Sequence, residues 1–310
     1  MAKKAPRKKS RSQSANRSPD RASDFERFYH DLYADRWPSL RQAMAAERRY
    51  HALSAGLERS YYLDEASYLA ASYLEAKAGE RILDLCAAPG GKSLSILSNI
   101  LSDAGEEPID LTSNERSASR RGRMKKVFAE HLPPSIAETI KVTGHDAARW
   151  GQIKPAAYDR IILDVPCSSE RHVVQEAKYL AQWSESRSNR LAQQAYSFAL
   201  SALQALKPGG GLLYATCALS TRENDDVIDR VLTRILKKGD MAVITDNSRK
   251  IAGPYARLTG GERSDSPDTE KHRPALPMPD WVEATSLGFA VLPDRAEGRG
   301  PMYFSRIKKL

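Results

Sequence analysis

The chain has 310 residues, a formal net charge of +9, and 41% hydrophobic and 28% charged residues, a composition typical of a globular protein with a sizeable core. No apolar run approaches the roughly 18 residues that cross a bilayer, and the first residues lack the apolar region of a signal peptide. Three cysteines argue against a secreted disulfide scaffold and favour a reducing compartment.

A basic segment opens the chain. Residues 1–19 contain seven Lys and Arg and no acid, so they carry +7 of the net charge and leave about +2 for the rest. Since they offer almost no side chain larger than alanine to a core, we predict a disordered basic tail over residues 1–23. The tail either aids solubility alone or contacts RNA phosphates, from which clustered Lys and Arg release counterions.

A short helical extension is predicted next, over residues 24–75. Four apolar residues recur at the i, i+3, i+4 and i+7 positions of an amphipathic helix, namely Phe25, Phe28, Tyr29 and Leu32. A second helix is predicted over residues 35–53, with Pro38 in its first turn.

From residue 80, short apolar runs alternate with helical segments, which predicts an α/β fold with a parallel sheet over residues 76–310. The predicted strands are Arg81–Cys86, Asp110–Asn114, Thr139–Val142, Arg160–Asp164, Gly211–Cys217 and a final one within residues 300–310. The predicted helices between them include Ser93–Leu101, Ala118–His131 and Asn189–Leu206. We expect Lys207–Gly210 to end the last helix, and residues 257–280 to form a long exposed loop.

The segment "RILDLCAAPGGKS" (Arg81–Ser93) predicts a buried strand, a Gly-rich turn and a helix start, where a ligand can approach the backbone closely. A phosphate-binding P-loop would need glycine where Cys86 stands, and the G-x-G-x-x-G dinucleotide pattern is absent. A nucleotide-like ligand without phosphate, S-adenosylmethionine, therefore suits the turn. The turn residues predicted to bind it are Cys86, Ala87, Ala88, Pro89, Gly90, Gly91 and Lys92.

Acidic residues follow the next two predicted strands. A ligand of an open α/β sheet lies across the carboxyl ends of the strands, so Glu115 is predicted to meet the ribose hydroxyls and Asp146 to lie near the adenine. Taken alone, each acid also suits a helix cap or a solvated turn. Their coincidence with the expected strand ends favours the binding role.

Cys167 and Cys217 follow the fourth and fifth predicted strands. If these strands are neighbours, their backbones lie about 5 Å apart and both thiols reach the cofactor edge. Cysteine there is often only a small hydrophobe, and we keep that interpretation for the Cys86 side chain. Beside a methyl donor, however, a thiolate can attack carbon 6 of cytosine, which makes carbon 5 nucleophilic toward the methyl group. Asp164 is placed to stabilise that adduct at the N3/N4 edge of the base, and the residues alone leave the choice between the cysteines open.

Three motifs together, "LDLCAAPGGKS", "DVPCSS" and "ATCALSTREN", resemble the Sun-type RNA cytosine-5 methyltransferases, over roughly residues 25–310. "YADRWPSLRQAM" and "GPMYFSRIKKL" are most similar to the branch that contains the mitochondrial ribosomal-RNA enzyme. The resemblance implies a Rossmann-like S-adenosylmethionine-dependent methyltransferase sheet with a short N-terminal helical extension.

The resemblance also implies roles for individual residues. Cys217 is the nucleophile, Cys167 assists breakdown of the adduct and release of RNA, and Asp164 holds the cytosine and borders the methionine end of the cofactor. Two positions depart from the family's pattern, because Glu115 stands where aspartate is frequent and Ser169 where glycine is frequent. The second departure leaves the target preference open.

The run "NERSASRRGRMKK" gathers basic residues around the start of one helix. A solvated face is their usual role, but in a nearly neutral globular part we predict contacts with RNA phosphates from Arg120, Arg123 and Lys125. Arg171, His172 and Lys178 are expected in a loop near the base. The target cytosine must be single-stranded or flipped out for its carbon 6 to be reached.

We therefore predict an RNA (cytosine-5-)-methyltransferase that acts on ribosomal RNA through a covalent cysteine–C6 adduct. The alternatives are a transfer-RNA methyltransferase and a catalytically silent RNA-binding ribosome-assembly factor; an ATP-hydrolysing protein is disfavoured by Cys86. The predicted partner is RNA, with no membrane, no metal and a monomeric chain. No metal site is expected because no C-x-x-C pair is present and the histidines are scattered. The predicted location is the cytoplasm, with the mitochondrion as the alternative.

Overall fold

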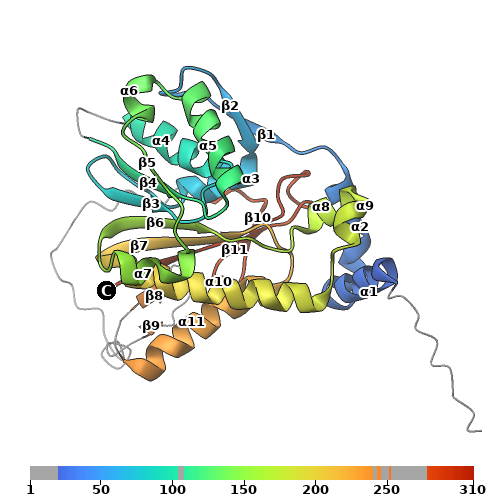
Figure 1. The fold of residues 1–310 in the computed structure, drawn as a ribbon. Helices are drawn as coiled ribbons and strands as arrows, with labels where there is room; N and C mark the ends of the chain where they lie inside the picture. The colour runs from blue at the N-terminus through green and yellow to red at the C-terminus, as the bar shows by residue number, and fades with distance from the viewer. Residues whose placement is uncertain (1–19, 104–107, 240–242, 246–250, 253–277) are drawn as a thin grey trace, which may run out of the picture.

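A mostly parallel sheet with helices on both faces forms the centre of the molecule (Figure 1). The computed structural model describes residues 20–103, 108–239, 243–245, 251–252 and 278–310. The predicted basic tail up to residue 19 and most of the predicted long loop lie outside these residues.

The strand order in the sheet is β10-β11-β12-β7-β6-β3-β4-β5, and strands β3 to β7 run parallel. The final strand β12 pairs antiparallel with β7, and β8 and β9 add a short antiparallel edge. The bounds are β3 Arg81–Asp84, β4 Asp110–Asn114, β5 Lys141–Thr143, β6 Tyr158–Asp164, β7 Leu206–Thr216, β8 Val243–Thr245, β9 Ile251–Ala252, β10 Val282–Ala284, β11 Phe289–Val291 and β12 Met302–Lys309.

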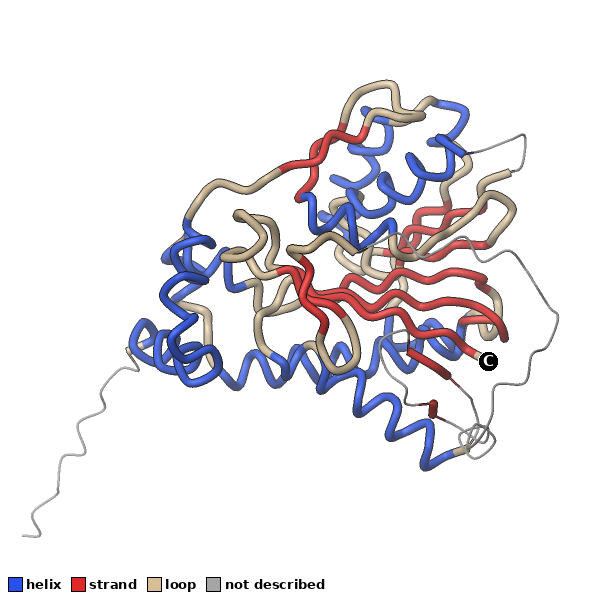
Figure 2. The backbone as a smooth tube through the Cα atoms, turned by 180° about the vertical axis from the view of Figure 1, so that it is seen from behind, coloured by secondary structure: helices blue, strands red, loops and turns tan. Residues whose placement is uncertain are grey.

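Alternating side chains of the central strands pack into two separate hydrophobic cores, one on each face of the sheet. This is why the apolar runs in the sequence are nearly continuous. On β6, Ile161 and Leu163 pack toward one face and Ile162 toward the other. The first face is covered by α7 (Trp150–Ile153), α10 (Glu185–Ala205) and α11 (Asp225–Lys238). The second is covered by α3 (Glu65–Ser72), α4 (Gly91–Asp103) and α5 (Ala118–His131), with α6 (Pro134–Ala137) beside them. Figure 2 shows the same three layers from behind. No helix of the described residues is long and apolar enough to cross a membrane.

The predicted α/β class and Rossmann-like sheet are confirmed, while several boundaries were wrong. The second predicted helix ends early, because α2 spans Trp37–Ala45 and Tyr50–Leu53 forms strand β1, which pairs with β2 (Tyr61–Asp64). The extension is therefore part helix and part hairpin. Lys207–Gly210 does not separate helix from strand either, because α10 ends at Ala205 and β7 begins at Leu206.

The N-terminal helices pack beside the carboxyl edge of the sheet. α1 (Arg21–Tyr33) begins inside the predicted tail because Asp20 caps it and accepts a hydrogen bond from the Ser23 amide. Aromatic side chains of α1 and α2 form a cluster with Trp183, and the Tyr29 and Trp37 rings stack at 5.1 Å. Figure 1 shows both helices beside α8 (Glu170–Gln175) and α9 (Ala177–Leu180).

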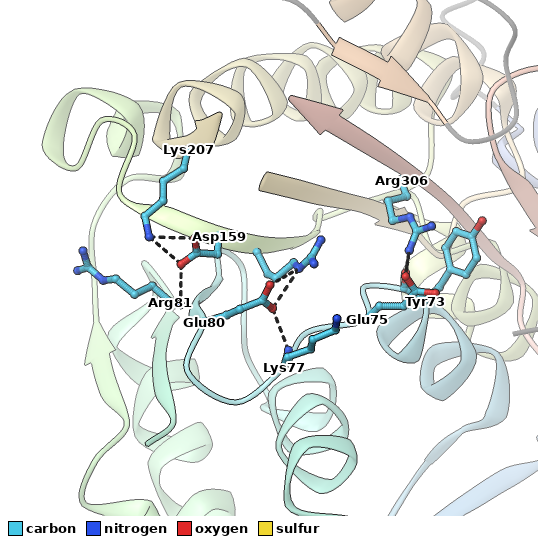
Figure 3. Close-up of polar contacts among 9 residues, drawn as sticks. Tyr73, Glu75, Lys77, Glu80, Arg81, Asp159, Lys207 and Arg306 are labelled. Carbon is cyan, nitrogen blue, oxygen red and sulfur yellow. Dashed lines mark hydrogen bonds and ion pairs between the residues drawn. The ribbon is translucent and has the colours of Figure 1, made fainter. Parts of the chain in front are cut away.

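Ion pairs hold the opposite, amino-terminal edge of the sheet (Figure 3). The Asp159 carboxylate accepts hydrogen bonds from the Arg81 amide at 2.9 Å and from Lys207 Nζ at 2.8 Å. Glu80, just before β3, pairs with Arg160 of β6 at 3.1 Å. These contacts fix the amino ends of β3, β6 and β7 relative to one another, so that their carboxyl ends can carry the functional side chains.

Candidate active site

The two cysteine thiols meet at the carboxyl ends of neighbouring parallel strands. β6 and β7 pair in parallel with Asp164 opposite Ala215, so the segments that leave them start side by side. Cys167 Sγ lies 2.9 Å from Cys217 Sγ and 3.3 Å from the Cys217 amide nitrogen. The structure thus brings together the two thiols that the sequence placed after separate strands.

The pair is electrically asymmetric. The hydrogen bond shared by the two thiols lowers the pKa of Cys217 and, together with burial, raises the pKa of Cys167 well above its ordinary value. The thiolate is the nucleophilic form of cysteine, so this asymmetry favours Cys217 as the nucleophile.

Ser169 lies within reach of both sulfur atoms. Its Oγ is 3.2 Å from Cys217 Sγ and 3.5 Å from Cys167 Sγ. Its φ of 56° is left-handed, a conformation that glycine adopts without strain, and this accounts physically for the frequent glycine at this position in the resembled family. Serine therefore adds a hydroxyl beside the Cys217 sulfur, at a cost in backbone strain.

Asp164 is held by an ion pair at the end of β6. Lys92 Nζ lies 2.6 Å from Asp164 Oδ2 and 3.5 Å from Ser67 Oγ. Burial opposes the charge of Lys92, but the Asp164 carboxylate outweighs it, so the pKa of Lys92 is raised. Lys92 therefore stays charged and links the predicted cofactor loop to the residue expected at the base.

The predicted cofactor loop runs from Cys86 to Gly90 across the end of β3. The Ala87 amide donates to the Asn114 carbonyl at 2.8 Å, and Gly90, with φ of 113°, closes the turn with a 2.7 Å bond to the Ala87 carbonyl. A Cβ at Gly90 would lie 2.9 Å from the Phe128 ring, so a larger residue does not fit. α4 begins at Gly91, and its N-terminal N–H groups suit an anionic group such as a carboxylate.

Glu115 lies at the end of β4 and is largely buried. Its Oε1 accepts from the Ser117 amide at 2.7 Å, and its Oε2 pairs with Arg120 Nη1 at 3.1 Å. Arg120 Nη2 donates to the Ala88 carbonyl at 2.7 Å, so this arginine braces the cofactor loop. Of the three predicted RNA contacts, Arg123 and Lys125 are the fully exposed ones.

Asp146 caps the short helix η2 (Ala147–Arg149), since its Oδ1 accepts from the Ala148 amide at 3.1 Å. Its Oδ2 is 3.3 Å from Arg116 Nη1. The capping role left open by the sequence is therefore present, and the Asp146 side chain is still about one-third exposed at 34%. The sequence analysis missed Asn114, whose side chain joins the ends of β3, β4 and β5 through Leu85, Thr143 and His145.

A small cavity opens beside Cys217. Its walls come from the hairpin segment, from α8 and from the approach to β12, and they comprise Arg48, Asp64, Ser67, Ser169, Arg171, His172, Cys217, Gly300, Pro301 and Met302. Within the described residues, Asp64 Oδ2 and His172 Nδ1 are buried without a hydrogen-bond partner. Sequence reasoning missed Arg48 and Asp64, because they belong to a segment that carries no motif.

The residues after Cys167 form a helix and not the expected loop, because α8 and α9 cover residues 170–180 with a single break. Arg171 is buried and donates to the carbonyls of Ala43, Met44, Gly298 and Gly300. It therefore joins three chain segments beside the cavity. Of the three basic residues predicted to lie near the base, only His172 and the exposed Lys178 remain available to contact RNA. The described residues contain no cluster of His, Cys, Asp and Glu suited to a metal ion.

The chain is similar in sequence to known RNA methyltransferases. Residues 71–256 match the family model described as "16S rRNA methyltransferase RsmB/F". The mouse 5-cytosine rRNA methyltransferase NSUN4 is 31% identical over 261 residues, which are 83% of this chain and 62% of the relative. The mouse mitochondrial tRNA (cytosine(34)-C(5))-methyltransferase is 30% identical over 277 residues, 89% of this chain and 68% of the relative.

A solved structure supports the fold. A methyltransferase homologue from Pyrococcus horikoshii superposes with a TM-score of 0.61 at 16% identity, and the match covers 94% of this chain and all of the other. The chain spans only 62% of the length of mouse NSUN4.

Proposed function

Since the chain belongs to the RsmB/F family of 16S rRNA methyltransferases, as its motifs predicted, we propose that it methylates carbon 5 of cytosine in RNA. The contact between Cys167 and Cys217 carries the proposal, because two thiols 2.9 Å apart suit the making and breaking of one covalent bond to the base. We assign the catalytic domain to residues 76–310 and the N-terminal extension to residues 24–75.

The cofactor proposed is S-adenosylmethionine, which when bound supplies the methyl group as a sulfonium. The residues that would hold it are those of the Cys86–Lys92 loop, with Glu115 at the ribose and Asp146 near the adenine. The tight turn at Gly90 and the N-terminus of α4 fit the amino-acid end of such a ligand. The buried Glu115 carboxylate, at the end of β4, suits hydroxyl groups.

In the proposed reaction, the Cys217 thiolate would add to carbon 6 of cytosine, and carbon 5 would then take the methyl group as the methyl–sulfur bond of the bound cofactor breaks and its sulfur keeps the electron pair. Asp164 contacts the N3/N4 edge of the base, kept in place by Lys92. After a base removes the carbon-5 proton, the C6–sulfur bond breaks and returns its electron pair to Cys217. Cys167 assists this elimination, since its thiol lies against the departing sulfur.

Ribosomal RNA is the proposed substrate, supported by the family description and by the NSUN4 relative. Transfer RNA is the second candidate, because the mitochondrial tRNA methyltransferase matches over more of both chains. Methylating total RNA with labelled cofactor and separating the species by size distinguishes them. Label confined to the transfer-RNA fraction would exclude the ribosomal substrate.

The cytoplasmic location stays a prediction. The relative named as mitochondrial supports the mitochondrial alternative. Fractionation of source cells, with the chain followed by antibody, separates the two.

Release of the carbon-5 hydrogen tests the proposed activity directly. RNA made with tritium on cytosine carbon 5 should lose tritium to water only when protein and S-adenosylmethionine are both present. The Cys217→Ser variant should lower the release by at least about a thousandfold, since removal of a covalent nucleophile abolishes its pathway. Wild-type protein that binds RNA but releases no tritium would favour the silent assembly factor instead.

A further inference from the structure

Two glutamates lie buried beneath the segments that carry the thiols. We name residues 165–169, between β6 and α8, the Cys167 loop, and residues 217–220, between β7 and the short helix η3 (Thr221–Glu223), the Cys217 loop. Glu170 directly follows the first loop and Glu223 lies three residues after the second, with 0% and 1% of their surfaces exposed. Neither the proposed catalysis nor the cofactor loop uses them.

Each glutamate binds the backbone of the opposite loop. Glu223 Oε2 accepts a hydrogen bond from the Ser168 amide at 2.9 Å, directly after Cys167. In the reverse direction, Glu170 Oε2 accepts from the Leu219 amide at 2.9 Å, two residues after Cys217. The two loops are thus joined by a reciprocal pair of amide-to-carboxyl hydrogen bonds in a buried environment, where such bonds are strong.

The remaining carboxylate oxygens are also occupied. Glu223 Oε1 accepts from the Ser188 hydroxyl of α10 at 2.5 Å, and Glu170 Oε1 accepts from the hydroxyls of Ser168 and Tyr29. Tyr29 belongs to α1, so the N-terminal extension reaches this network. The carboxylates therefore have fixed positions, set by hydrogen bonds from α1, α10 and both loops.

We propose that Glu170 and Glu223 are positioning residues that hold the two cysteine sulfur atoms at contact distance. Neither carboxylate has a hydrogen bond to a thiol among the described residues, so their action passes through the loop backbones. The consequence for catalysis rests on the proposed function, whereas the spacing of the sulfur atoms does not.

We name the two hydrogen bonds, from the Ser168 amide to Glu223 and from the Leu219 amide to Glu170, the clamp. The distance between the two sulfur atoms depends on the clamp. A covalent step needs its reacting atoms within a few tenths of an ångström, and a displacement of about 1 Å costs on the order of a hundredfold in rate. Burial and the nearby charge of Glu170 raise the pKa of Glu223 to about 7, so this site opposes the ionisation of Glu223. A neutral amide at position 223 would keep the acceptor for the Ser168 amide without that penalty, so positioning requires the hydrogen-bond acceptor and not the charge.

Formation of a Cys167–Cys217 disulfide measures the spacing without any methyl transfer. The oxidant is a diazene such as diamide, which accepts two electrons and two protons from the two thiols and becomes a hydrazine. In wild-type protein the adjacent thiols should close quickly, as followed by mass spectrometry of the linked peptides. Glu223→Ala should slow closure at least tenfold, while Glu223→Gln, which keeps an acceptor for the Ser168 amide, should stay within about threefold of wild type.

Asp225→Ala is the matched control. The Asp225 carboxylate also accepts backbone hydrogen bonds, from Ser286 at 3.1 Å and Leu287 at 3.2 Å, but among the described residues none of its hydrogen bonds comes from either cysteine loop. The Asp225→Ala variant should be less stable than wild type, but its Cys167–Cys217 disulfide should form at the wild-type rate. Equal slowing in both alanine variants, or closure at the wild-type rate in a folded Glu223→Ala protein, would overturn the proposal.

A methyl-transfer assay on the same variants then separates this proposal from the proposed function. If wild type transfers methyl groups, Glu223→Ala should lose turnover while cofactor affinity is unchanged. If wild type transfers none but the disulfide rates follow the predicted order, the clamp stands and the proposed function fails.

Discussion

Gly90 shows how one residue can decide the shape of the cofactor loop. Its φ of 113° lies where L side chains are strained, and the Phe128 ring lies 2.9 Å from where its Cβ would be. Gly209 has a similar constraint on its backbone, with φ of 79°, but nothing lies within 4 Å of its Cβ position. Substitutions at the two glycines can therefore be compared to separate the effect of backbone strain from that of a steric clash beneath the loop.

We expect Gly90→Ala to lower the free energy of unfolding by about 2–4 kcal/mol and to weaken S-adenosylmethionine binding at least tenfold, through strain and the clash together. Denaturant unfolding and calorimetric titration measure the two effects. Gly209→Ala should cost only the strain, about 1–2 kcal/mol, and leave cofactor affinity unchanged. Equal affinities for Gly90→Ala and wild type would show that the loop does not bind the cofactor.

Glu223 gives the fold a pH dependence of definite sign. Its folded pKa of about 7 exceeds its ordinary value of 4.5, so the folded state keeps a proton that the unfolded chain releases in this range. Its contribution to stability is therefore full below about pH 4.5 and is lost as the pH rises through 7. Glu223→Gln, which does not titrate, should gain on the order of 3 kcal/mol relative to wild type between pH 4 and pH 8. Urea unfolding at pH 4, 6 and 8 tests this, and a constant difference would contradict it.

At the scale of elements, α5 combines a buried stripe with a basic exposed face. Met124 and Phe128 pack under the cofactor loop, while Arg123 and Lys125 are exposed. Arg120, at the start of the helix, contacts the loop itself. The exposed face of α5 therefore continues from the cofactor site and suits a phosphate backbone.

Replacing Arg123 and Lys125 by glutamine should weaken RNA binding and lower the slope of log affinity against log salt by about 1 to 2, because each lost phosphate contact removes roughly 0.7–0.9. Cofactor affinity should not change. Arg190→Gln, an exposed position on α10 at the other face of the sheet, is the control. An unaltered salt dependence in the double variant would exclude α5 from the RNA contact.

Local patterns predicted the elements well where packing did not override them. β4 and α5 have the predicted bounds, because their apolar periodicity and caps agree with their burial. The β1–β2 hairpin was missed since Tyr50–Leu53 continues the helical spacing, and only pairing with Tyr61–Asp64 makes it a strand. No role was predicted for Glu170 or Glu223, although Glu223 lies within the motif "ATCALSTREN", because both stand in polar segments and their burial arises from contacts with other parts of the chain.

On the scale of the whole molecule, the amino-terminal and carboxyl-terminal edges of the sheet have different roles. Ion pairs such as Asp159–Lys207 fix the amino ends (Figure 3). The carboxyl ends carry the thiols, Asp164 and the proposed cofactor loop. α2 and the segment before β12 also meet at the functional edge, because Arg171 binds carbonyls from both. The motifs predicted which strand ends carry the candidate site, while the cavity walls depend on contacts between segments more than 100 residues apart.

The central claim is the division of labour between the two cysteines. Wild type, Cys217→Ala and Cys167→Ala are incubated with methyl-labelled cofactor and total RNA, and both RNA label and denaturant-resistant protein–RNA adducts are measured. We predict neither label nor adduct for Cys217→Ala, and accumulated adduct for Cys167→Ala, since the first thiol makes the covalent bond and the second assists its breakage. Methylation by Cys217→Ala would contradict the assignment of the nucleophile.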